Sequence, residues 1–169
     1  MVNYIDVTDK WINDAKPRKG NIHFLNYSIT PDGERYDYTN SVLDFNVDDD
    51  FYVGCWFRNN IWGNCRFQPA IVFPHKKRSA DLRLFGKCSL IDEQTIEIKT
   101  ITSKRKDGII LRLKEAKGQS SNVLLDLSYN PFTDDEIKSI VEKYFVNHDW
   151  LKVVIVKRKD NLLFVWQKV

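Results

Sequence analysis

The chain has 169 residues, of which 43% are hydrophobic and 29% are charged. This balance excludes extended disorder and predicts one domain with a buried core, in which residues 1–64 form a helix and hairpin region packed on a core of residues 65–169. The formal net charge is only +3, no hydrophobic run is long enough to cross a membrane, and Met1 is not followed by a signal peptide, so we expect action in the cytoplasm.

The N-terminal third of the chain predicts a short helix and a hairpin. Thr8 is a suitable N-cap for a helix over residues 8–15. A strand is expected over residues 22–29, and the turn residues Pro31–Gly33 predict a hairpin with a second strand at residues 35–38. Residues 48–60 favour a helix, because three aspartates suit its positive N-terminal end, although the aromatic residues that follow would also suit a strand.

From residue 81 onward, strands alternate with helices. We expect strands at residues 81–85, 95–100, 122–127, 151–156 and 162–166, and helices at residues 109–120 and 133–145. Thr133 and Glu136 form a capping-box pattern that begins the last helix, and the apolar run Val123–Leu125 indicates a strand covered on both faces. The alternation predicts an α/β (α+β) fold, with a mixed β-sheet flanked by helices.

Two charged residues on the strand at 95–100 are candidates for chemistry. Glu97 and Lys99 are two positions apart and therefore project to the same face. If the strand that begins at Asp81 pairs beside them, a second carboxylate joins the same edge. Two carboxylates can hold Mg²⁺, which polarises a phosphoryl oxygen and lowers the pKa of bound water, and a lysine can stabilise the developing charge. A cross-strand salt bridge on a solvated sheet face would give the same pattern.

Three stretches of this region resemble a known family. The segments Ser79–Asp81, Thr95–Lys99 and Leu113–Asp126 are similar to the C-terminal nuclease domains of contact-dependent growth inhibition toxins, and to related domains of phage and polymorphic-toxin proteins. The similarity covers residues 65–169 and extends more faintly to the start of the chain. It implies a PD-(D/E)xK nuclease-like fold and a metal-dependent endonuclease that cleaves RNA, above all tRNA, or DNA.

The resemblance also implies a role for each matching residue. Asp81 and Glu97 resemble the metal-binding acids of the family, and Lys99 resembles its active-site lysine. Gln119 matches a glutamine that recurs in the helix after the Glu-x-Lys strand, although an exposed amide near a helix end would look the same. The implied cofactor is a divalent metal ion, Mg²⁺ first with Mn²⁺ or Zn²⁺ as alternatives, and the implied partner is a cognate immunity protein.

Basic clusters suggest where a phosphate backbone could bind. We expect this contact from Lys76, Lys77, Arg78, Lys104 and Arg105. A third basic cluster, Lys157–Lys159, is compatible with the same kind of partner. Each cluster would also suit a solvated loop between strands.

Two departures from the family pattern keep another function open. The family's Pro-Asp dipeptide is Ala80–Asp81 here, and the glutamate usual on the preceding helix aligns with Tyr52, with Asp50 the nearest acid. A catalytically inactive nuclease-like binding module, or an immunity or interaction protein of a toxin or mobile-element system, is therefore the alternative to the nuclease.

The cysteines add no site to this description. Cys55, Cys65 and Cys88 are odd in number and lack the spacing of a disulfide framework or a zinc site. We expect reduced thiols, as is usual for a cytosolic protein. The sequence also contains neither a glycine-rich phosphate loop nor a nucleophile elbow.

Overall fold

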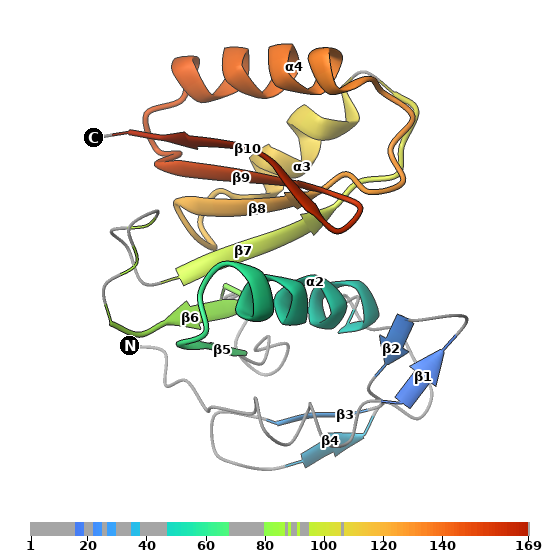
Figure 1. The fold of residues 1–169 in the computed structure, drawn as a ribbon. Helices are drawn as coiled ribbons and strands as arrows, with labels where there is room; N and C mark the ends of the chain where they lie inside the picture. The colour runs from blue at the N-terminus through green and yellow to red at the C-terminus, as the bar shows by residue number, and fades with distance from the viewer. Residues whose placement is uncertain are drawn as a thin grey trace. The chain divides into compact units, whose positions relative to one another are not determined.

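The chain divides into two compact units, Met1–Phe85 and Gly86–Val169, which we call the N-terminal and the C-terminal unit and describe one by one. The computed structural model describes the side chains of residues 52–67, 80–86, 88, 91, 95–105 and 107–168, and the backbone of the strands and the helix that lie before residue 52 (Figure 1).

Short strands form two small antiparallel sheets in the described part of the N-terminal unit. They are β1 (Lys16–Arg18), β2 (Ile22–Phe24), β3 (Tyr27–Ile29) and β4 (Arg35–Asp37). β1 pairs with β2, and β3 pairs with β4 across the Pro31–Gly33 segment, which confirms the predicted hairpin. The strand predicted over residues 22–29 is divided into β2 and β3, because each half pairs with a different partner. The helix predicted over residues 8–15 lies outside the described residues.

A helix and a further strand pair follow in the same unit. The helix α2 (Val47–Asn60) confirms the preference for a helix over residues 48–60. β5 (Cys65–Phe67) pairs antiparallel with β6 (Leu82–Leu84), and its end residues are buried together with Leu82 and Leu84 opposite them. The sequence did not predict β5, because three residues are too few for an alternating pattern to be distinguished from chance.

The cysteine of α2, Cys55, has a protonated and unreactive thiol. Burial raises the pKa of Cys55 to about 11, against the opposing effect of Arg58. Since the thiolate is the reactive form of cysteine, this side chain is inert near neutral pH. Cys65 and Cys88 form no disulfide bond either.

The C-terminal unit is built on a mixed sheet with helical cover. In chain order its elements are β7 (Thr95–Thr100), α3 (Gly108–Ala116), β8 (Asn122–Asp126), α4 (Asp134–Asn147), β9 (Val153–Arg158) and β10 (Asn161–Gln167). Within this unit the strands follow the order β10-β9-β8-β7, with β7, β8 and β9 parallel and β10 antiparallel to β9 (Figure 1). The predicted mixed sheet flanked by helices is therefore confirmed.

The core of this unit lies between the sheet and its two helices. All of β8 is buried, as its continuous apolar run predicted. The side chains that pack together here from the four main elements are Ile109, Leu113 and Ala116 of α3, Ile137, Val141, Tyr144 and Phe145 of α4, Val123 and Leu125 of β8, and Val154 and Val156 of β9. Both helices thus cover the face of the sheet to which Val123 and Leu125 belong.

The beginning of α4 and the end of α3 differ in how well the sequence predicted them. The capping box is confirmed: Glu136 N donates to Thr133 Oγ1 at 3.2 Å, and Thr133 N donates to Glu136 Oε2 at 3.1 Å. By contrast, α3 ends at Ala116, four residues earlier than expected. Gly118 follows with a φ of +92°, a left-handed conformation that commonly ends helices at glycine. Gln119 therefore lies in a turn and not on the helix.

None of the helices in the described part of the chain is long and apolar enough to cross a membrane.

Gly54 provides a test of the packing of the N-terminal unit. A Cβ atom at this position of α2 would lie 2.3 Å from Cε1 of Phe67 on β5, so the helix and the strand approach more closely than alanine allows. We expect Gly54→Ala to destabilise the protein by about 1–3 kcal/mol, as overpacking does, although alanine favours helix by about 1 kcal/mol. Urea unfolding measures the effect.

Gly63→Ala is the matched control, because a Cβ atom at Gly63 meets no atom within 4 Å. A Gly54→Ala protein as stable as the Gly63→Ala protein would contradict the close approach.

Candidate active site

Two charged side chains are buried on β7. Glu97 is 3% exposed and Lys99 is 7% exposed. In the register with β8, Glu97 lies opposite Val123 and Lys99 lies opposite Leu125. Because paired residues of neighbouring strands share a face, both charges belong to the face of the sheet that α3 and α4 cover. Neither is the solvated surface charge that a simple cross-strand salt bridge would require.

The two charges neutralise each other. Lys99 Nζ lies 3.1 Å from Glu97 Oε1. Buried charges are tolerated when they are paired and hydrogen-bonded, since each alone would lose its hydration without compensation. The pair therefore fixes the end of the Lys99 side chain beside the Glu97 carboxylate.

A second contact to Lys99 comes from the turn after α3. Lys99 Nζ donates a hydrogen bond to Gln119 Oε1 at 3.2 Å. Three residues that the sequence singled out, Glu97, Lys99 and Gln119, thus meet at one ammonium group. Such an arrangement can hold a cation at the carboxylate, donate a proton or a hydrogen bond from the ammonium, and orient both through the amide.

Asp81 belongs to the N-terminal unit. It directly precedes β6 and is 7% exposed, next to the buried Ala80. Its meeting with Glu97 stays a prediction.

The available donors suit a hard cation. In the ranges that the structure describes, no group of three or more His, Cys, Asp or Glu side chains is arranged to hold a metal ion. A metal at Glu97 would therefore rest on one or two carboxylates, with water and substrate oxygens completing its shell. Mg²⁺ binds in this way, whereas structural zinc sites have four protein ligands. The residues present fit Mg²⁺ or Mn²⁺ better than Zn²⁺.

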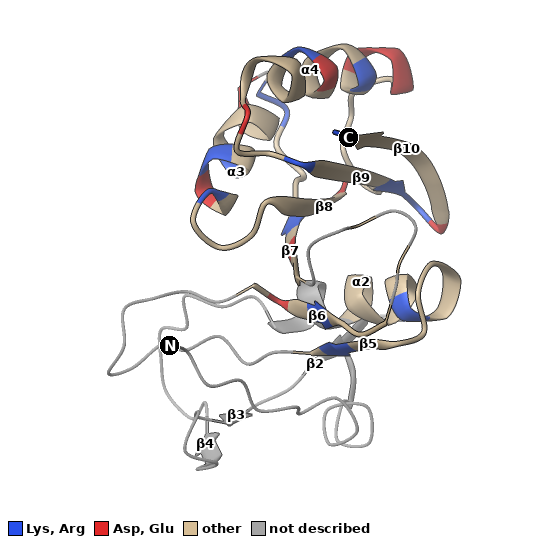
Figure 2. Cartoon of the chain, turned by 90° about the vertical axis from the view of Figure 1, so that its left-hand side faces the viewer, with Lys and Arg blue, Asp and Glu red and all other residues tan. Residues whose placement is uncertain are grey.

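The predicted phosphate-binding residues are described only in part. Lys76, Lys77 and Arg78 lie outside the described residues. Lys104 and Arg105 are exposed in the loop before α3, and Figure 2 shows residues of both charges on this helix. Arg105 forms a bidentate pair with Asp107, with distances of 3.1 Å and 2.9 Å. An exposed pair of this kind contributes little to stability, and the contact of Arg105 with phosphate stays a prediction.

A buried ion pair at the ends of β8 and β9 escaped the sequence analysis. Lys157, which we had placed in a basic surface cluster, is 1% exposed. Its Nζ lies 3.6 Å from Asp126 Oδ1 and donates to Ser128 Oγ at 3.0 Å, while Ser128 Oγ donates to Asp126 Oδ1. The assignment to a surface cluster was wrong, because Lys157 continues the buried side chains of β9. The pair is identified by the register of Lys157 opposite Asp126, which the sequence alone does not give.

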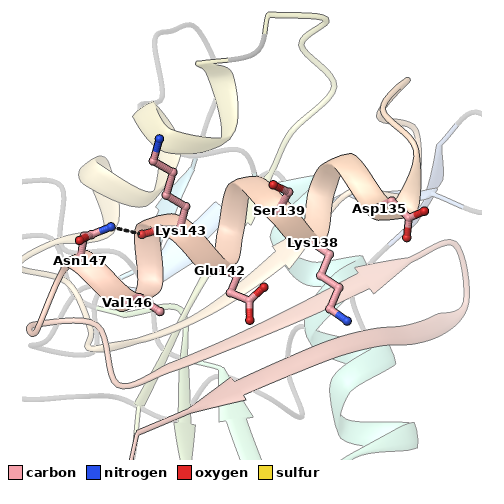
Figure 3. A pocket seen from close by; sticks show the side chains of 7 residues that line it. All are labelled: Asp135, Lys138, Ser139, Glu142, Lys143, Val146 and Asn147. Carbon is pink, nitrogen blue, oxygen red and sulfur yellow. Dashed lines mark hydrogen bonds between the residues drawn. The ribbon is translucent and has the colours of Figure 1, made fainter.

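A shallow hollow on α4 is unrelated to these residues. Its lining comes from one helix alone, namely Asp135, Lys138, Ser139, Glu142, Lys143, Val146 and Asn147 (Figure 3). Charges of both signs alternate along it, and the side chain of Asn147 donates to the carbonyl of Lys143 at 2.7 Å. Glu97, Lys99 and Gln119 do not line it, so this hollow is not the candidate site.

Comparison with protein-family models places a match within the C-terminal unit. Residues 89–162 match the family model described as the contact-dependent growth inhibition CdiA C-terminal domain. The matched segment contains Glu97, Lys99 and Gln119 and begins after Asp81. No curated protein matches the chain.

Among solved structures, the chain resembles one chain of the CdiA-CT/CdiI toxin and immunity complex from Burkholderia pseudomallei. The TM-score is 0.52 at 14% sequence identity, and the match covers 76% of this chain and 95% of the other. At this identity the likeness shows a shared fold.

The buried pair on β7 makes a testable contribution to stability. Lys99→Met removes the cation and leaves the Glu97 carboxylate buried, which we expect to cost about 3–5 kcal/mol in the free energy of unfolding. The double variant Glu97→Gln/Lys99→Met should lose less than the sum of the two single variants, because neither charge is then left alone. Urea unfolding of the four proteins measures the coupling.

Lys143→Met, on the exposed face of α4, is the control and should change stability by less than about 0.5 kcal/mol. If Lys99→Met is as mild as this control, the side chain of Lys99 is not engaged with Glu97 in solution.

Proposed function

We propose that the chain is a toxin that hydrolyses phosphodiester bonds of nucleic acid with a divalent metal ion. The premise is that the segment 89–162 belongs to the family of contact-dependent growth inhibition CdiA C-terminal domains. The contact of Lys99 with both Glu97 and Gln119 carries the proposal. A carboxylate, an ammonium and an amide around one point are the groups that a metal-assisted attack of water on phosphorus needs.

Each residue has a distinct part in this reaction. Glu97, with Asp81, holds the metal ion, which when bound polarises a phosphoryl oxygen and makes water more acidic. Lys99 donates hydrogen bonds to the attacking water or to the developing negative charge on the phosphoryl oxygens. Gln119 keeps the Lys99 ammonium in place through its amide oxygen. Mg²⁺ is the metal we expect, with Mn²⁺ and then Zn²⁺ as alternatives.

The substrate we propose is RNA, above all tRNA, or DNA. Lys104 and Arg105, exposed before α3, hold the phosphate backbone, together with Lys76, Lys77 and Arg78. The cytoplasm of a target cell is where such substrates are found. The similar solved structure is a toxin and immunity complex, which supports a cognate immunity protein as the partner that protects the producing cell.

One observation favours a second function. Glu97 and Lys99 are buried and already neutralise each other, as they would in a nuclease-like module that binds a partner without catalysis. This alternative keeps the fold and the basic surface but predicts no cleavage.

Substitution of the paired charges separates the two functions. Purified protein with Mg²⁺ should cleave total tRNA or plasmid DNA, and chelation with EDTA should stop the reaction. Glu97→Gln and Lys99→Met should each lower the rate by about 10²–10³-fold, since each removes a group that acts in the transition state. Gel electrophoresis of the nucleic acid measures cleavage, with Lys143→Met as the control that keeps full activity.

If the wild-type protein cleaves neither nucleic acid with Mg²⁺, Mn²⁺ or Zn²⁺, the nuclease proposal is wrong and the binding module remains.

The basic loop before α3 is tested through its salt dependence. The double variant Lys104→Gln/Arg105→Gln should weaken binding of a non-cleaved nucleic acid while kcat stays near the wild-type value. Two fewer phosphate contacts make the slope of log K against log salt shallower by about 1.8 for duplex DNA and about 1.4 for a single strand. Fluorescence anisotropy at several salt concentrations measures this slope.

Lys138→Gln/Lys143→Gln on α4 removes the same charge from another surface and serves as the matched control. If both double variants change the slope equally, binding of the nucleic acid depends on net charge alone and not on the loop before α3.

A further inference from the structure

Polar groups of three residues meet where β7 and β8 begin. Ser120 Oγ donates to the carbonyl oxygen of Thr95 at 3.0 Å and lies 3.0 Å from Thr95 Oγ1. Asn122 Nδ2 donates to the same carbonyl at 2.9 Å, and Asn122 N donates to Ser120 Oγ at 3.1 Å. Ser120 and Asn122 are both buried. We call these three residues the Thr95 clamp.

The direction of each hydrogen bond in the clamp follows from the chemistry of a hydroxyl group. Ser120 Oγ has one proton and two lone pairs. Its proton goes to the Thr95 carbonyl, so the Thr95 hydroxyl must donate to Ser120 Oγ, and the second lone pair accepts from Asn122 N. The Ser120 hydroxyl is therefore fully used, and it joins the first residue of β7 to the first residue of β8.

The clamp fixes the residue that contacts Lys99. Gln119 directly precedes Ser120, and the backbone N–H groups of both residues donate to the carbonyl of Ala116 at the end of α3. The turn is thus held at one side by α3 and at the other by Thr95. Thr95, Glu97 and Lys99 alternate along one strand and share a face, so the clamp sets the position of Gln119 relative to the same strand that carries the charged pair.

We propose that Ser120 is a positioning residue for Lys99, supported by Thr95 and Asn122. The inference rests on the proposed function in assigning Lys99 a part in catalysis. Ser120 acts through Gln119, whose amide oxygen keeps the Lys99 ammonium beside Glu97. Without the Ser120 hydroxyl, Asn122 still satisfies the Thr95 carbonyl, so the fold survives while Gln119 gains freedom. A small displacement of a positioned group can slow a reaction by up to about 10²-fold.

A double-mutant cycle of cleavage kinetics tests the proposal. Ser120→Ala should lower kcat by about tenfold and leave KM near its wild-type value, while the melting temperature falls modestly because the buried Asn122 N loses its acceptor. In a Gln119→Ala background the same substitution should change kcat by less than about twofold, because Ser120 then has no amide to position. If the kcat losses of Ser120→Ala and Gln119→Ala multiply in the double variant, the two residues act independently and the proposal is overturned.

Neighbouring substitutions provide the controls. Ser121→Ala removes a hydroxyl for which no hydrogen bond is found in the described part of the chain, and it should leave kcat unchanged. If Ser120→Ala does not fold, Thr95→Val and Thr95→Ser replace it. Thr95→Val removes the donor and should slow the reaction, whereas Thr95→Ser keeps the donor and should not. Equal rates for the two Thr95 variants would overturn the proposal.

A spectroscopic measurement tests the positioning without any activity. In ¹⁵N NMR spectra, Ser120→Ala should shift or broaden the Lys99 ammonium signal as Gln119→Ala does, while Ser121→Ala should not. If the wild-type protein cleaves nothing but Ser120→Ala perturbs this signal, the positioning stands and the proposed function fails. If the wild-type protein cleaves and Ser120→Ala changes neither kcat nor the signal, the positioning fails alone.

Discussion

Lys99 Nζ lies 3.1 Å from Glu97 Oε1, and the residues paired with them on β8 are the apolar Val123 and Leu125. This contact constrains the C-terminal unit. Neither charge could remain on the covered face of the sheet without the other. Because the ammonium also bonds to Gln119, the pair links β7 to the turn that ends α3. The packing of α3 over the sheet and the chemistry of the candidate site therefore depend on the same three side chains.

Much of the fold followed from local patterns. β7 was predicted with the bounds that the structure has, and the Thr133 capping box began α4 as expected. The errors arose where tertiary pairing decides the structure. β1 and β5 have three residues each and are stabilised by their partners, which no local pattern reveals. The early end of α3 did have a local signal, since Gly118 is the residue type that commonly ends helices.

The sequence predicted less of the candidate site than of the fold. The period of a strand placed Glu97 and Lys99 on one face, but only the family resemblance suggested Gln119. A turn residue that contacts a strand twenty positions earlier leaves no periodic trace in the sequence. For the same reason the Thr95 clamp went unnoticed. Lys157 shows the opposite error, because charge alone suggested a surface where register with Asp126 places a buried pair.

The most direct test of the metal-dependent centre is a crystal structure of the chain grown with Mn²⁺, in which anomalous scattering locates the ion. We predict an ion within about 2.0–2.6 Å of carboxylate oxygens of both Glu97 and Asp81, with Lys99 and Gln119 beside it. The account would be contradicted by an ion bound elsewhere while Lys99 stays paired to Glu97. In that case the carboxylates of Glu97 and Asp81 would lie more than about 10 Å apart, too far to share one ion.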